Sequence, residues 1–232
     1  QQLINGLTLG SVYGLIAIGY TMVYGILRLI NFAHGDVFMA AGLIGIYLTA
    51  SMPLYISLPL VVILTVVLGF AIERLAYKPL RTAPRMSVMI SAIGVSYLLQ
   101  NLATYITGGQ PMTYPNIPML TKTVTIAGTP TKMAVLVTPV LVVVLVIALT
   151  QLINHTKIGM GMRAVSKDFE TAQLMGIKIN SVISATFIVG SALAAIGSTL
   201  YFSCYTAVTP TIGALPGLKA FVAAVFGGIG SV

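Results

Sequence analysis

Long apolar runs alternate with short polar segments along most of the chain. Most of these runs approach or exceed the roughly 20 residues that an α-helix needs to cross a bilayer. The pattern therefore predicts an all-α protein, a polytopic bundle of transmembrane helices in a single domain over residues 1–232. The predicted spans cover residues 3–27, 29–51, 58–76, 86–107, 133–153, 181–204 and 217–232.

The seventh run stops before it reaches spanning length, and the chain does not begin with methionine. We therefore expect a fragment of a longer membrane protein, an incomplete domain whose C-terminal spans are missing. No signal or transit segment is recognisable before the first span, so we expect the N-terminus to belong to the membrane domain.

A polar break interrupts the second run between residues 31 and 36. The apolar piece that follows, residues 37–51, has only 15 residues and is too short to cross a bilayer alone. A discontinuous second helix, broken within the membrane, resolves this shortfall. Ionisable groups at membrane depth are costly, so they are functional candidates by default. The functional candidates in this break are Asn31, His34, Gly35 and Asp36.

Composition agrees with a membrane protein, because 57% of the residues are hydrophobic, 7% are charged and the mean hydropathy is +1.01. A net charge of +8 would suggest a nucleic-acid partner in a soluble chain. Here the basic residues gather in a few short loops, as orientation signals do, so we expect a lipid bilayer and no nucleic acid. Cys204 is the only cysteine, which excludes an internal disulfide.

The basic residues also predict the orientation of the chain. Nine fall in segments that we place on the cytoplasmic side, and three fall outside. The inside set is Arg28, Arg74, Lys78, Arg81, Arg85, Lys157, Arg163, Lys167 and Lys178, and the outside set is Lys122, Lys132 and Lys219.

The remaining connections read as loops. Residues 52–59 contain two prolines and predict a short loop, while residues 108–132 and 205–216 predict external loops, the first with a small hairpin. Glu73 beside Arg74 predicts a solvated ion pair at the interface. Gln100 and Asn101, near the outer end of the fourth span, could meet a substrate or a partner protein, but hydrogen bonds between helices are the favoured interpretation for them, as for Ser96.

A short amphipathic helix is predicted over residues 166–175, in the second cytoplasmic loop. Ser166 or Asp168 can cap its start, Glu170 adds negative charge to its first turn, and Gly176 suits a left-handed stop. Its mixed charges differ from the broad basic face of a membrane-surface helix, so docking into a groove of another protein is the better interpretation.

Several motifs carry a resemblance to a known family. Glu170-Thr171-Ala172 with Gly176 looks like the Glu-Ala-Ala…Gly loop with which the membrane subunits of bacterial ABC importers dock onto their ATPases, although Thr171 departs from the usual alanine. Residues 5–11, 19–26, 30–36, 72–81, 90–96 and 219–231 resemble, in the same order, the LivH-type permease of branched-chain amino acid importers, a family of binding-protein-dependent inner-membrane components.

The resemblance implies a permease subunit of the ABC importer fold in the bacterial inner membrane, moving Leu, Ile or Val into the cytoplasm. It implies four partner subunits of three kinds: a related second permease of the LivM type, two cytoplasmic ATPase subunits and an extracytoplasmic amino-acid-binding protein. ATP and Mg²⁺ would be used by the ATPases, so we expect no cofactor, metal or catalytic residue in this chain. The coupling helix would be residues 166–175, with Arg163, Asp168, Glu170, Ala172 and Gly176 facing the ATPase.

The same resemblance gives the break at residues 31–36 a role. A broken helix can direct N–H groups toward a substrate carboxylate and carbonyls toward its ammonium, so Asn31 and His34 would line or gate the path. A purely structural alternative remains open: Asn31 and His34 satisfy backbone groups freed by the break, and Asp36 caps the following helix.

Three other functions fit parts of the sequence. A urea or short-chain amide permease of the same family would differ around Phe32. An ion-coupled secondary transporter would carry carboxylates within its spans and an internal repeat, whereas all four acids here map to breaks or cytoplasmic ends. An intramembrane hydrolase would need a serine elbow or a metal-binding triad beside His34 and Asp36, and the sequence offers neither.

Overall fold

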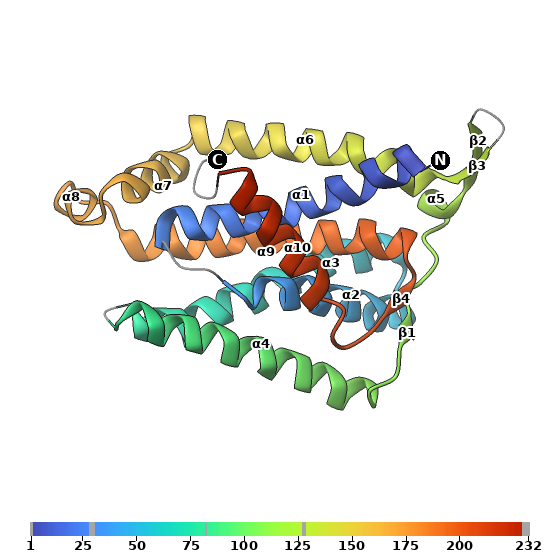
Figure 1. Cartoon of the computed structure of the whole chain (residues 1–232), viewed down its shortest axis with the longest axis horizontal. Helices are drawn as coiled ribbons and strands as arrows, with labels where there is room; N and C mark the ends of the chain where they lie inside the picture. The colour runs from blue at the N-terminus through green and yellow to red at the C-terminus, as the bar shows by residue number, and fades with distance from the viewer. Residues whose placement is uncertain (1, 28–30, 82, 127–128, 229–232) are drawn as a thin grey trace.

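The computed structural model describes residues 2–27, 31–81, 83–126 and 129–228. Most helices run along the long axis of the molecule, with α7 and α8 extending from one end and the β2–β3 hairpin from the other (Figure 1). The helices are α1 Gln2–Leu27, α2 His34–Ser51, α3 Leu54–Ile72, α4 Arg85–Thr107, α5 Pro118–Thr121, α6 Met133–His155, α7 Lys157–Lys167, α8 Phe169–Leu174, α9 Ile179–Cys204 and α10 Ala214–Phe226.

Five helices in the described residues are long and apolar enough to cross a membrane: α1, α3 with its continuation to Leu80, α4, α6 and α9. This confirms the prediction of an all-α, polytopic membrane protein. The central one is α9, which packs against α1, α2 and α3. Small side chains permit this close approach, since a Cβ on Gly69 of α3 would lie 1.8 Å from Ser191 Oγ of α9.

The second helix begins later than predicted. Residues Asn31 to Ala33 form a turn, and His34, Gly35 and Asp36 already belong to the first turn of α2. The break is therefore confined, within the described residues, to the segment before His34; Leu29 and Ile30 lie outside them. An acidic residue in the first turn is favoured by the helix dipole, which explains why Asp36 does not interrupt the helix.

The predicted loop at residues 52–59 is wrong for most of its length. Only Met52 and Pro53 separate the two helices, and α3 starts at Leu54 with Pro59 inside it. A proline near the start of a helix removes few hydrogen bonds, and membrane helices tolerate it. At its other end α3 continues as a π-helical turn, Glu73–Tyr77, and a 3-10 turn, Lys78–Leu80, so the predicted cytoplasmic loop is partly helical.

The outer loops are tied together by two small sheets. The predicted hairpin is confirmed as β2 Thr123–Ile126 paired with β3 Thr129–Lys132. A second pairing, β1 Met112–Thr113 with β4 Ala207–Val208, was not predicted, because it joins loops nearly a hundred residues apart in the sequence.

The last helix differs from the predicted span 217–232. It starts at Ala214, ends at Phe226 and has 13 residues; residues 229–232 lie outside the described part. In Figure 1, α10 crosses the other helices obliquely. The segment predicted to stay outside, residues 205–216, instead returns into the bundle, where Gly213 contacts the start of α2.

Candidate functional site

The starts of α2 and α10 touch each other inside the bundle. A Cβ on Gly35 would lie 2.5 Å from the carbonyl oxygen of Gly213, and a Cβ on Gly213 would lie 2.2 Å from that of Gly35. Only glycine permits backbones to approach this closely. Two helix N-termini, from segments far apart in the sequence, therefore meet at one point.

His34 fills a slot between α1 and α9 beside this junction. The side chain is 2% exposed, and a Cβ on Gly19 would lie 2.2 Å from its Nε2. Its ring stands edge-on to Tyr20, with centroids 5.0 Å apart, and Nε2 has no hydrogen-bond partner among the described residues. His34 thus packs among helices and does not line the cavity described next, so its role in a gate stays a prediction.

Asp36 lies at a cavity of about 260 Å³ beside the same junction. Its carboxylate accepts hydrogen bonds from Ser96 Oγ and, at 3.0 Å, from Gln100 Nε2, both on α4. The sequence predicted these two residues to bond between helices, and they do. The cavity is lined by Tyr20, Phe32, Asp36, Ser96, Gln100, Gly213, Ala214, Gly217, Leu218 and Phe221.

The suggestion that Asp36 caps its own helix is wrong. The N-cap position of α2 is Ala33, with no side-chain cap, and both hydrogen bonds recorded for the Asp36 carboxylate come from α4. The side chain is 2% exposed. A carboxylate held between two helices and facing a cavity is suited to bind a ligand cation, or a donor group, there.

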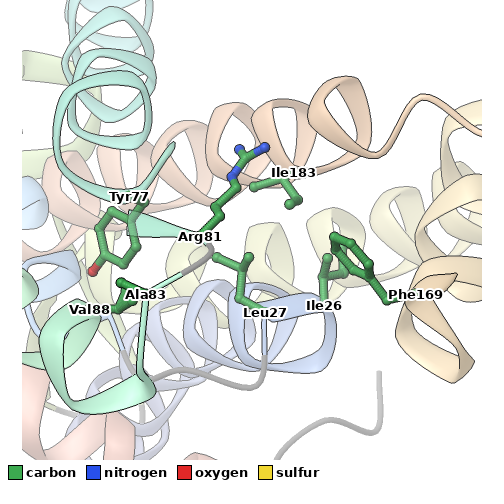
Figure 2. Close-up of a pocket in the computed structure, with 8 residues that line it drawn as sticks. All are labelled: Ile26, Leu27, Tyr77, Arg81, Ala83, Val88, Phe169 and Ile183. Atoms are coloured by element: carbon green, nitrogen blue, oxygen red, sulfur yellow. The ribbon is translucent and has the colours of Figure 1, made fainter. Parts of the chain in front are cut away.

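Asn31 is held by the helix that follows the third span. Tyr77, the last residue of the π-helical turn, donates a hydrogen bond of 2.7 Å to Asn31 Oδ1, and both side chains are buried. Tyr77 also lines a second cavity, of about 330 Å³, nearer the end that carries α8. Figure 2 shows Tyr77 and Phe169 on opposite sides of this cavity, which is lined by Ile26, Leu27, Tyr77, Arg81, Ala83, Val88, Phe169 and Ile183.

Glu73, at the other end of the π-helical turn, is fully buried, which contradicts the predicted solvated pair with Arg74. It forms an ion pair with Arg81 and accepts a hydrogen bond of 2.9 Å from Ser184 Oγ of α9. Arg81 also donates to Asn180, at the start of α9. The turn Glu73–Tyr77 therefore contacts α9 through Glu73 and contacts Asn31, the residue before Phe32, through Tyr77.

The predicted coupling helix, residues 166–175, is divided between two helices. Ser166 lies in the last turn of α7, and α8 begins only after Asp168, whose Oδ1 accepts from the backbone N–H of Glu170 and Thr171 at 3.0 and 3.2 Å. Of the two predicted caps, Ser166 and Asp168, the structure therefore confirms Asp168. Hydrogen bonds from the Thr171 hydroxyl and N–H hold the pKa of its carboxyl below the usual range, so it stays ionised at the helix start.

The sequence predicts how α8 ends, and the structure shows which of its side chains are exposed. Gly176 adopts the predicted left-handed conformation, with φ +81°, directly after the helix. Ala172 is buried, whereas Leu174 and Met175 at the end of the helix are 87% and 79% exposed. The residues that point outward from α8 are available to another protein.

Arg163 lies apart from α8. It is on α7 and donates to Asn154 Oδ1 at 2.9 Å, next to the end of α6. It therefore positions α7, and its assignment to the ATPase contact stays a prediction.

Sequence reasoning missed several residues of this region. Tyr77, Arg81 and Gly213 carried no pattern of their own, because each acts through a partner that is distant in the sequence. Glu73 did carry a signal that was undervalued: an acid directly after a long apolar run is a functional candidate.

Comparisons with known proteins identify a family and several relatives. Residues 2–232 match the family described as branched-chain amino acid transport system, permease component. The chain is 42% identical to the high-affinity branched-chain amino acid transport system permease protein BraD of Pseudomonas aeruginosa, over the whole chain and 80% of that protein. It is 38% identical to LivH of Escherichia coli with the same coverage, and 27% identical to a probable LivH of Methanocaldococcus jannaschii over 93% of the chain and 70% of the relative.

These matches extend along essentially the whole sequence. The five membrane-spanning helices fit a transport permease that resides in a membrane. The chain belongs to the family of permease components of branched-chain amino acid transport systems.

Proposed function

We propose that the chain is the LivH-type membrane subunit of an ATP-driven importer that moves branched-chain amino acids across the bacterial inner membrane into the cytoplasm. In this assembly a related second permease completes the membrane part, two cytoplasmic ATPases hydrolyse ATP with Mg²⁺, and an extracytoplasmic binding protein delivers the substrate. Family membership and the names of the relatives support the substrate class.

One structural observation supports the proposed ATPase contact more than any other. Helix α8 has a side-chain cap at Asp168, a glycine stop at Gly176 and outward-facing apolar side chains at Leu174 and Met175. Its first residue, Phe169, lines the cavity that Tyr77 also lines. A rigid helix with this placement can pass a displacement by the ATPase to the membrane helices.

Two features of the membrane part fit a route for neutral amino acids. The cavity at Asp36 combines one carboxylate and two neutral polar groups with aromatic walls, as a zwitterion with an apolar side chain requires. Asn31, His34, Gly35 and Asp36 all lie at the start of α2 or in the turn before it, next to this cavity. We assign Asp36 to the path itself, Gly35 to the α2–α10 junction, and Asn31 and His34 to positioning the start of α2.

The test is uptake of labelled leucine into proteoliposomes that contain the full-length permease with its co-purified subunits. We expect uptake to require both ATP and binding protein. Glu170→Ala and Gly176→Pro should abolish uptake while the complex still assembles, because both residues lie on or next to α8. Exposed Gln173→Ala, on the same helix, serves as a milder control.

Uptake of leucine down an ion gradient without ATP would overturn the proposal, and an ion-coupled transporter would replace it. Uptake that is ATP-dependent but selective for urea or short amides would overturn the substrate class alone.

A further inference from the structure

We propose that the cavity at the α2–α10 junction binds the substrate amino acid during transport, with the substrate ammonium on the Asp36 carboxylate. This inference rests on the proposed function and adds the recognition chemistry to it. Its ligand class is an α-amino acid with a branched apolar side chain.

The first argument concerns charge. Among the described residues the one recorded ion pair joins Arg81 and Glu73, so no described Lys or Arg neutralises Asp36. The carboxylate is 2% exposed, and a buried charge without a counter-ion is strongly disfavoured. A ligand ammonium that enters the cavity supplies the missing charge.

The second argument concerns hydrogen-bonding capacity. Ser96 and Gln100 each donate one hydrogen bond to Asp36, one to each carboxylate oxygen. An ionised carboxylate offers about four acceptor sites. The two donors from α4 therefore orient the carboxylate and leave about two acceptor sites for an ammonium group.

The third argument concerns the substrate carboxylate. Helix α10 starts at the same cavity with Ala214, has no acidic residue in its first turn and has no side-chain cap at Gly213. The start of a helix favours an anion, whereas the start of α2 already carries Asp36. The ammonium group of a zwitterion thus fits the start of α2, which carries Asp36. Its carboxylate fits the start of α10, which has no acidic residue and no side-chain cap.

The fourth argument concerns the side chain. Phe32, Phe221 and Tyr20 form an aromatic cluster in the lining, with ring centroids 6.4 Å apart for Phe32 and Phe221 and 6.1 Å apart for Tyr20 and Phe221. The volume of about 260 Å³ is near the lower end of small-molecule sites, which begin at about 300 Å³. The cavity therefore suits a ligand as small as one amino acid, with its apolar side chain against the aromatic rings.

The test measures binding of labelled leucine to the purified permease–ATPase complex in nanodiscs, without binding protein. Two competitors separate the charges: isopentylamine keeps the ammonium and the branched chain, and 4-methylpentanoate keeps the carboxylate and the branched chain. For the wild type we expect isopentylamine to displace leucine. For Asp36→Asn we expect the affinity for leucine to fall by about tenfold or more, and displacement by isopentylamine to be lost, because a charge-assisted hydrogen bond is removed.

Two variants serve as controls. Asp36→Glu keeps the charge and should keep displacement by isopentylamine. Ser198→Ala removes a buried hydroxyl of α9 that does not line the cavity, and it should bind leucine as the wild type does.

The proposal is overturned if isopentylamine fails to displace leucine from the wild-type complex, whatever the variants do. It is also overturned if Asp36→Asn binds leucine with wild-type affinity. Either result, in a complex that still imports leucine with ATP, leaves the proposed function intact. A wild-type complex that does not import leucine counts against the proposed function instead.

Discussion

The hydroxyl of Tyr77 donates a 2.7 Å hydrogen bond to Asn31 Oδ1, and this bond links residues at the cavity that contains Phe169 and beside the cavity that contains Asp36. Tyr77 lines the cavity that also contains Phe169 of α8. Asn31 immediately precedes Phe32, which lines the cavity at Asp36. This pair of side chains offers a contact route along which a change at one cavity can reach the other.

Tyr77→Phe removes this hydrogen bond and keeps the ring that packs on Phe187. Leaving the buried Asn31 Oδ1 without its donor costs about 1–3 kcal/mol, so the complex should still assemble. We expect ATP hydrolysis to continue while the leucine transported per ATP falls several-fold, because the turn before α2 is no longer linked to α3. The measurement is the ratio of uptake to phosphate release in proteoliposomes.

Tyr105→Phe is the matched control, since Tyr105 is exposed on α4. Its ratio should equal that of the wild type. An unchanged ratio in Tyr77→Phe would show that the bond is structural only.

Glu73→Ala leaves the largely buried guanidinium of Arg81 without its carboxylate partner. Removing one partner of a buried ion pair costs about 3–5 kcal/mol, so thermal unfolding in detergent should shift to clearly lower temperature. The double variant Glu73→Leu with Arg81→Leu should recover much of this loss, because neither charge remains buried. Arg74→Met, at the exposed neighbouring position, should stay within about 0.5 kcal/mol of the wild type. Equal shifts for Glu73→Ala and Arg74→Met would refute this account.

Gly213→Ala places a Cβ 2.2 Å from the carbonyl oxygen of Gly35, where the backbone cannot yield easily. We expect a poorly assembled complex with a lower unfolding temperature, equivalent to a loss of about 1–3 kcal/mol or more. Gly94→Ala in α4 is the control, because nothing lies within 4 Å of the added Cβ. In a helix interior that change should be neutral or stabilising by up to about 1 kcal/mol. Size-exclusion profiles and melting curves measure both, and equal behaviour of the two variants would contradict the close contact.

Asp168→Ala removes the cap of α8, whereas Asp168→Asn retains a side chain that caps equally well. We expect the alanine variant to lose leucine uptake and the asparagine variant to keep most of it. Ser166→Ala, on the preceding helix, should resemble the wild type.

The same cap has a pH dependence with a definite sign. Since the pKa of Asp168 is lowered in the folded protein, its contribution is present above the usual Asp pKa and is lost as the pH falls through the lowered value. Uptake should therefore show no titration of this cap near neutral pH. A wild-type loss of uptake between pH 8 and 6 that Asp168→Asn abolishes would contradict this assignment.

Features that depend on neighbours in the sequence could be predicted. The cap at Asp168 and the left-handed stop at Gly176 follow from local backbone chemistry, and the spans follow from the length of apolar runs. The family was recognisable because its motifs recur in order along the chain.

Features that depend on distant partners could not be predicted. Nothing near Gly213 indicates that Gly35 occupies the space beside it, and nothing near Ser96 indicates a carboxylate 60 residues away. The predicted start of α2 differs from the observed one for a related reason, because polar residues within an apolar run favour a break when their partners on other helices are unknown. The structure satisfies Asp36 through α4 and keeps the helix intact.

The strand pairing at Val208 fixes the length of the connection that follows it. Val208 is held opposite Met112, and Gly213 is held against Gly35, so only the four residues 209–212 join two fixed points. An inserted or deleted residue would have to rotate the start of α10 or separate the strands. This connection should therefore tolerate substitutions far better than changes in its number of residues.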